Sequence, residues 1–234
     1  IRILVYIFSL IIFQSCSVFM PFKNLPQPDG KYIIGTDVLI LEDFNRQEFF
    51  TDNLDDFRKI VVQVWYPANS KTDSIYPYLD YVDIRTAYIS KQIGIPEKMI
   101  KHINKIKANA YYKALPLNKE FPIIIFSHGL GGNRTQNSIN IESLASNGYV
   151  VFSIEHSYDA NVTVFDDSTF VEFDSYLSDK ADEEEFYATR IDPSISEDLW
   201  MNSSVFFVFS NKIKKYLRKI PEAYCNLFVI IIIL

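Results

Sequence analysis

Residues 121–156 constrain the fold of this chain more than any other feature. Residues 123–126 are an apolar run of strand length, and the glycine-rich sequence HGLGG and a segment of helical spacing follow it. A second apolar run, YVVFSIEH, begins directly after Gly148. Continuous apolar runs of this length are typical of parallel strands covered on both faces. A strand, a helix and a strand in close succession therefore predict a βαβ unit in a parallel sheet.

The helix of this unit has recognisable ends. Asn133 is a suitable N-cap, and Gln136 lies three residues later, as in a capping box. Gly148 occupies a position where a helix C-terminus favours a residue with positive φ. The side chains expected to face the sheet are Ile141, Leu144 and Ala145.

Other segments extend the predicted fold on both sides of this unit. Residues 31–43 and 58–67 are rich in Val and Ile and predict strands. Residues 162–165 and 169–173 predict a small hairpin. In residues 96–108 a helix is expected, because one apolar stripe recurs at helical spacing. Its members are Met99, Ile100, Ile103 and Ile106.

The N-terminal segment has the pattern of a targeting signal. Arg2 precedes a largely apolar run of 11 residues, which is shorter than the roughly 20 residues that a membrane-spanning helix needs. The run ends at Ser15 and Cys16, which resemble the end of a bacterial lipoprotein signal. A lipoprotein signal with acylated Cys16, an ordinary cleaved signal and an uncleaved membrane-associated segment all fit this pattern. The predicted division is a signal peptide at 1–16, a proline-rich linker at 17–30 and one α/β domain at 31–234.

Composition and charge exclude several classes of function. The chain of 234 residues is long enough for one large domain, and its net charge of −6 argues against a nucleic-acid partner. Two cysteines do not form a disulfide framework, and the three histidines lack metal-ligand spacing. We therefore expect no metal, no cofactor and no nucleic acid.

The glycine-rich turn is the strongest candidate for chemistry. Glycines let a substrate carbonyl approach the backbone, and backbone N–H groups in such a turn can stabilise a developing oxyanion. A tight strand-to-helix turn without any ligand is the alternative. A phosphate-binding loop is disfavoured, because the turn has neither G-x-G-x-x-G spacing nor a Gly-Lys-Ser/Thr sequence.

Several motifs in the same order resemble one known family. The sequence FPIIIFSHGLGGNRTQNSINIESLASNGYVVFSIEHSYDA resembles the corresponding segment of the secreted, or type II, platelet-activating-factor acetylhydrolase family. Upstream, LPQPDGKYIIGT, VQVWYPA and KANAYYKALPL are also similar to that family. The similarity extends over about residues 25–165.

This resemblance implies an α/β-hydrolase fold, a mostly parallel sheet with helices on both faces. It implies a serine esterase that hydrolyses short sn-2 acyl esters of phospholipids. The backbone N–H of Leu130 would be one oxyanion donor, with Gly129, Gly131 and Gly132 shaping the turn. His128 would shape the same turn rather than act as a base.

The catalytic triad of the family has no counterpart in this sequence. The family carries its nucleophilic Ser in a Gly-His-Ser-x-Gly-Gly elbow, followed by Asp and then His. Gly148 is the last glycine and His156 the last histidine, so this order cannot occur after the motif strand. We expect the Ser, Asp and His beyond residue 234, because we interpret the hydrolase domain at 31–234 as incomplete, truncated before the nucleophile elbow. His156 is then expected to be structural and His102 to be exposed on its lysine-rich helix.

Two other functions remain open at this point. One is a non-catalytic, membrane-anchored protein that binds a lipid or a partner, and the other is a different α/β hydrolase of dienelactone type. For the esterase, the expected partners are a phospholipid or short-chain ester substrate and a membrane surface reached through a lipid anchor. The expected location is extracytoplasmic, either secreted or anchored to a bacterial membrane.

Overall fold

The computed structural model describes residues 24–48, 50–174 and 229–233. The predicted signal peptide with Cys16, the first part of the linker and an acidic segment at 180–186 lie outside these ranges. Residues 24–30, the described part of the linker, form neither helix nor strand, as expected. Among the described residues, no helix is both long enough and apolar enough to cross a bilayer.

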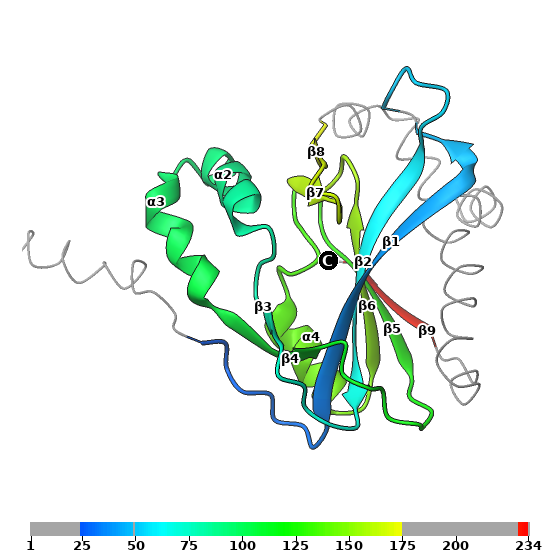
Figure 1. The fold of residues 1–234 in the computed structure, drawn as a ribbon, viewed down its shortest axis with the longest axis vertical. Helices are drawn as coiled ribbons and strands as arrows, with labels where there is room; N and C mark the ends of the chain where they lie inside the picture. Colours follow the sequence, from blue (N-terminus) through cyan, green and yellow to red (C-terminus); the bar gives the residue numbers. More distant parts are fainter. Residues whose placement is uncertain (1–23, 49, 175–228, 234) are drawn as a thin grey trace, which may run out of the picture.

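A seven-stranded sheet organises the described residues (Figure 1). The strand order is β3-β4-β1-β2-β6-β5-β9. The bounds are β1 Ile33–Gln47, β2 Phe57–Ala68, β3 Ile75–Pro77, β4 Lys107–Tyr112, β5 Ile123–Ser127, β6 Val150–His156 and β9 Val229–Ile233. The predicted strands β1, β2, β5 and β6 are confirmed, whereas β3 and β4 were not predicted.

The strand directions divide the sheet into two halves. Strands β6, β5 and β9 run parallel to one another, as the βαβ pattern predicts. In the other half, β1 pairs with β2 and β2 with β6 in antiparallel fashion, while β4 joins β1 in parallel. β3 is antiparallel to β4. The sheet is therefore mixed, and the prediction of a mostly parallel sheet holds for the β6–β5–β9 half.

Helix α4, Ser138–Ser146, is the helix of the βαβ unit. Asn133 N–H donates to Gln136 Oε1 at 3.3 Å, but the Asn133 side chain accepts from the Thr135 N–H, so only half of the predicted capping box forms. Asn137 is the N-cap, because residues 134–137 form turns before the helix begins. Ile141 and Ala145 are buried against the sheet, and Leu144 packs beside them, as predicted. Gly148 has a φ of 98°, which confirms its role after the helix end.

The helix predicted at 96–108 is much shorter in the structure. Helix α3 spans Glu97–Ile100, a 3₁₀ helix continues over Lys101–Lys105, and β4 begins at Lys107. The expected apolar stripe is incomplete, because Met99 is 40% exposed whereas Ile100 and Ile106 are buried. His102 is partly exposed on the 3₁₀ helix.

Two further elements lie near the carboxyl ends of β5 and β6. Helix α2, Val82–Ile93, was not predicted. The predicted hairpin is confirmed as β7, Val162–Val164, and β8, Phe170–Glu172, which pair in antiparallel fashion. Figure 1 shows α2, α3 and α4 on the same side of the sheet. The prediction of helices on both faces is thus tested on one face only.

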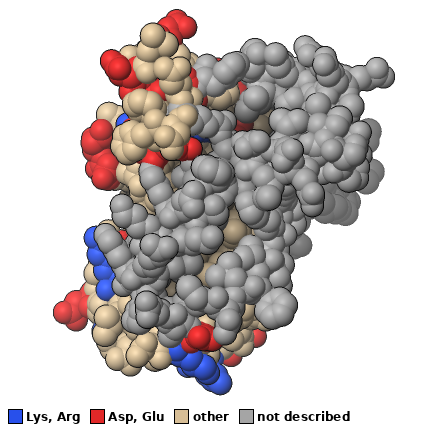
Figure 2. Space-filling view, turned by 90° about the vertical axis from the view of Figure 1, so that its right-hand side faces the viewer, with Lys and Arg blue, Asp and Glu red and all other residues tan. Residues whose placement is uncertain are grey.

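The core has one apolar cluster on each face of the sheet. One cluster contains Val62, Val64 and Phe152, and the other contains Trp65, Ile124 and Ile141. At the end of the molecule where the β1–β2 loop lies, the view in Figure 2 shows acidic side chains.

Candidate active site

The glycine-rich turn leaves the carboxyl end of β5 and is held from two sides. The loop after β6 contacts its backbone, since Gly131 N–H donates to Asp159 O at 2.8 Å and Asn161 N–H donates to Gly132 O at 3.0 Å. From α2, Gln92 Nε2 donates to Gly131 O at 3.1 Å. Gly131 has a φ of 72°, a conformation that glycine adopts without strain. Hydrogen bonds from the loop after β6 and from α2 therefore fix the backbone of the turn, and we call the turn braced in this sense.

Leu130 lies at the tip of this braced turn. This residue is 57% exposed. Its backbone N–H makes no hydrogen bond to any other residue within the described ranges. Gly132 could not carry a side chain unchanged, because a Cβ there would lie 2.9 Å from Gly129 O. The turn thus offers a backbone amide donor that no described residue engages, in a glycine-lined backbone.

His128 connects the ends of β5 and β6. Its Nδ1 lies 2.7 Å from Gly129 O and must donate there, while its Nε2 lies 3.2 Å from the backbone N–H of His156 and must accept. These two contacts require the neutral imidazole with the proton on Nδ1. Burial lowers the pKa of His128, which favours the same neutral form. The side chain therefore shapes the turn and is not available as a base.

A serine and a histidine also meet at this edge, which the sequence did not reveal. Ser127 Oγ lies 2.8 Å from His156 Nε2. The contact has the geometry of a nucleophile and its base, but burial, followed by the nearby His128 and Arg58, lowers the pKa of His156 to about 3. An imidazole with such a low pKa is a poor general base near neutral pH. We interpret the pair as a structural contact between two strand ends.

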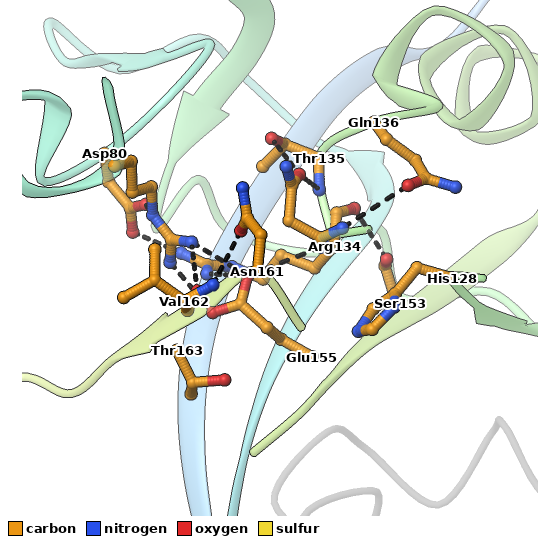
Figure 3. A network of polar contacts seen from close by, with 12 residues as sticks. Asp80, His128, Arg134, Thr135, Gln136, Ser153, Glu155, Asn161, Val162 and Thr163 are labelled. Carbon is orange, nitrogen blue, oxygen red and sulfur yellow. Dashed lines mark hydrogen bonds and ion pairs between the residues drawn. The ribbon is translucent and has the colours of Figure 1, made fainter. Parts of the chain in front are cut away.

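Four buried charged side chains form one network near the end of β6, and Figure 3 labels three of them, Asp80, Arg134 and Glu155. Glu155, at the end of β6, forms ion pairs with two arginines: Arg85 Nη2 lies 2.9 Å and Arg134 Nη1 lies 2.8 Å from its carboxylate oxygens. Asp80 forms ion pairs with the same two arginines, through Arg85 Nε at 2.9 Å and through Arg134 Nη2. The side chains of Arg134 and Glu155 are completely buried, and those of Arg85 and Asp80 are 1% and 12% exposed. Two positive and two negative charges balance within this group, which we call the charge cluster.

The carboxylates of the charge cluster remain ionised. Burial alone would raise the pKa of Glu155, but Arg134 and then Arg85 outweigh it and hold that pKa below its usual range. Burial would likewise raise the pKa of Asp80, but Arg134 and, more weakly, Arg85 outweigh burial and lower that pKa. Tyr76 O–H adds a hydrogen bond of 3.1 Å to Asp80. Each buried carboxylate thus has both charge partners and hydrogen-bond donors.

Sequence reasoning missed the charge cluster, although one signal was visible. Ser153 and Glu155 alternate along the otherwise apolar strand β6, so they point to the same face. Polar residues with this period in a fully buried strand indicate buried partners. The identity of those partners had no such signal, because Arg85 and Glu155 are 70 positions apart in the chain.

The remaining candidate residues are easily placed. Gly129, Leu130, Gly131 and Gly132 lie together in the turn, whereas Cys16 lies outside the described residues. Within the described ranges, no group of three His, Cys, Asp or Glu side chains could hold a metal ion.

Strand β9 pairs in parallel with β5, and Ile233 lies opposite Ser127. The carboxyl end of β9 is therefore beside the start of the turn.

Comparison with solved structures supports the fold. A ferulic acid esterase from Streptomyces cinnamoneus superposes with a TM-score of 0.56 over 72% of this chain and 45% of that chain. The two sequences are 23% identical, so the similarity concerns the fold alone. Together with the mixed sheet and the βαβ unit, it identifies an α/β-hydrolase fold.

Comparison with known sequences is more specific. The platelet-activating factor acetylhydrolase of Canis lupus familiaris is 28% identical over 142 residues, and that of Cavia porcellus is 29% identical over 139 residues. Each match covers 57% of this chain, but only 28% of the dog protein and 29% of the guinea-pig protein. The family model described as platelet-activating factor acetylhydrolase, isoform II, matches residues 18–192. The chain therefore belongs to the platelet-activating factor acetylhydrolase isoform II family.

Proposed function

We propose that this chain is part of a carboxylic ester hydrolase and supplies one donor of its oxyanion hole, the backbone N–H of Leu130. The observation that carries the proposal is the Leu130 amide, which has no partner among the described residues, at the tip of a turn that β6, its following loop and α2 hold in place. The family relationship and the hydrolase fold support the same reaction class. The substrates we propose are short sn-2 acyl esters of phospholipids, in keeping with the names of the relatives.

The proposed chemistry follows from where negative charge develops. When a nucleophile attacks an ester carbonyl, the carbonyl oxygen becomes an oxyanion, and a fixed N–H donor stabilises it without reorganising. Losing one such donor typically costs about 2.7–4 kcal/mol of activation free energy. Because the turn is braced, the Leu130 amide needs little further ordering during the reaction.

The nucleophile of this proposal comes from outside the described residues. We propose that the Ser, Asp and His of the triad follow residue 234. A turn that followed β9 would emerge beside the glycine-rich turn, because β9 and β5 are parallel and in register. We also propose that the 234 residues alone hydrolyse no ester, since the Ser127–His156 pair has a histidine of very low basicity.

The experiment compares two substitutions at Leu130 in the full-length gene product. Leu130→Pro removes the N–H, whereas Leu130→Ala keeps it and removes most of the exposed side chain. On an acetyl-phospholipid, we expect Leu130→Pro to lower kcat roughly 10²–10³-fold and Leu130→Ala to leave kcat nearly unchanged. Equal kcat values in the two variants, with both folded by circular dichroism, would overturn the assignment of the donor.

The choice of substrate has its own test. Turnover of an acetyl-phospholipid should exceed turnover of simple acetyl esters such as p-nitrophenyl acetate in kcat/KM. The reverse order would favour another α/β hydrolase, such as one of dienelactone type. Binding of phospholipid without any turnover would favour a non-catalytic binding protein.

We propose an extracytoplasmic location with Cys16 as the lipidated residue. The support is the sequence pattern of residues 1–16. Mass spectrometry of the mature N-terminus should find diacylglyceryl-modified Cys16. An unmodified N-terminus at a later residue would contradict lipidation and leave an ordinary secretory signal.

A further inference from the structure

We propose that the charge cluster of Asp80, Arg85, Arg134 and Glu155 positions the oxyanion donor. These are positioning residues, because they act through the backbone of the turn and do not touch the reacting atoms. The inference rests on the proposed function, since it assigns a role toward the same Leu130 amide. It concerns side chains for which the sequence predicted no role.

The first step is that β6 fixes the backbone on the C-terminal side of the turn. Ser153 Oγ donates to Arg134 O at 2.7 Å, and the backbone N–H of Arg134 donates to Glu155 Oε2 at 3.4 Å. The Arg134 side chain adds its ion pair of 2.8 Å with the same carboxylate. One strand face thus holds both the main chain and the side chain of a residue only four positions after Leu130.

The second step is that the cluster joins this anchor to α2. Arg85, on α2, forms a two-pronged contact with Glu155, and its Nη1 also donates to Val162 O at 3.1 Å. Gln92, on the same helix, donates to Gly131 O within the turn. The turn is therefore held between α2 and β6, and the cluster fixes the separation of these two supports.

The third step is energetic. A buried ion pair gives up much of its attraction to desolvation, and apolar residues of similar volume often stabilise a fold equally well. Further back on the same face of β6, Val151 packs into the apolar core, so this strand can use such packing. The charged, directional contacts at the end of β6 nearest the turn are therefore better explained by the geometry they impose than by stability. Misplacing a catalytic group by about 1 Å can lower the rate 10²-fold.

The test compares two buried glutamates in the full-length gene product. Glu155→Gln removes the charge that faces both arginines. Glu142→Gln is the matched control, because Glu142 is equally buried on α4 but its carboxylate bonds to Asn109 on β4. We expect both to lower the melting temperature. Only Glu155→Gln should lower kcat, by roughly 10–100-fold, with KM changed less than about twofold. Equal kcat values in the two variants would overturn the inference.

A double variant shows whether the effect passes through Leu130. In the Leu130→Pro background, Glu155→Gln should cause little further loss of kcat, because the donor is already absent. Full additivity of the two losses would contradict positioning through this amide. If Leu130→Pro leaves kcat intact, the proposed function itself fails. If Leu130→Pro lowers kcat and Glu155→Gln does not, only the present inference fails.

A second measurement needs no turnover and uses a milder change. Arg134→Lys keeps the positive charge but cannot reach Asp80 and Glu155 in the same forked geometry. In ¹⁵N-leucine-labelled protein, the Leu130 amide signal should shift or broaden in Arg134→Lys and stay unchanged in Glu142→Gln. An unchanged Leu130 signal in folded Arg134→Lys would overturn the inference, even if no substrate were found.

Discussion

Strands β5 and β6 differ sharply between their bodies and their carboxyl ends. In the bodies, Ile124 and Phe152 belong to the apolar clusters on the two faces of the sheet. At the ends, Ser127, Glu155 and His156 are polar and make named hydrogen bonds or ion pairs. Apart from the half-buried Ser127, these residues are buried in both regions, so the contrast lies in chemistry and not in exposure.

The difference indicates a division of tasks within the same strands. Apolar packing is non-directional and stabilises the fold through the area it removes from water. Hydrogen bonds and ion pairs are directional, and they stabilise little once desolvation is counted. The bodies should therefore determine stability, and the carboxyl ends should determine the position of the glycine-rich turn.

The largest effect on stability is expected in a strand body. Phe152→Ala leaves a cavity in a cluster where this side chain is fully buried, and it should lower the free energy of unfolding by about 3–5 kcal/mol. Urea denaturation measures this change. Well below its melting temperature, the variant should keep the kcat of the full-length protein. A large loss of kcat in folded Phe152→Ala would break the comparison.

A smaller effect on stability is expected in the charge cluster, together with an effect on rate. Asp80→Asn removes a carboxylate that accepts from Arg85, Arg134 and Tyr76, and it should cost about 1.5–3 kcal/mol of unfolding free energy. Unlike Phe152→Ala, it should also lower kcat. Urea denaturation and steady-state kinetics on the same preparation measure both quantities. Unchanged kcat would count against a role of Asp80 in positioning.

The buried histidines predict a loss of stability in mild acid. The pKa of His156 is about 3 in the folded protein, and that of His128 is also lowered, whereas unfolded histidine titrates near 6.5. The unfolded state therefore binds more protons below pH 6.5. The stability is fully present above that pH and declines as the pH falls, by up to about 1.4 kcal/mol per pH unit for each histidine.

Urea denaturation at several pH values between 5 and 7 checks this slope. His156→Asn should reduce the slope by about one proton, because one of the two histidines is removed. An equal slope in the variant and the parent would show that His156 is not the group that titrates.

The smallest effect is expected at an exposed ion pair on β1 and β2. Lys59 Nζ lies 3.3 Å from Glu42 Oε1, but the lysine side chain is 44% exposed. Lys59→Ala should change the unfolding free energy by less than about 1 kcal/mol. A larger loss would mean that ion pairs contribute more to this fold than the comparison allows.

The sequence predicted the elements whose signal is local. The βαβ unit, the hairpin of β7 and β8, and the positive φ of Gly148 follow from apolar runs and turn residues, and all three are confirmed. Helix α2 escaped prediction because its buried side chains include Arg85 and Thr86, so it has no clear apolar stripe. The charge cluster escaped because its partners come from distant parts of the chain.

Residues 96–108 show the opposite error. Their apolar residues recur at helical spacing, yet Ile106 is extended and leads into β4. Pairing of β4 with β1 and β3 satisfies the backbone there and outweighs the local pattern. The candidate turn was visible in the sequence because glycine marks it directly, whereas the side chains that hold the turn were not.

The most direct test of the account is a crystal structure of the full-length gene product with a phosphonate ester bound to its nucleophilic serine. The phosphonyl oxygen of such an adduct stands in for the oxyanion of the reaction. We predict that this oxygen lies about 2.7–3.1 Å from the backbone N of Leu130, with Arg134 still paired to Glu155. An adduct whose oxygen is held by other donors, with the Leu130 amide turned away, would contradict the account.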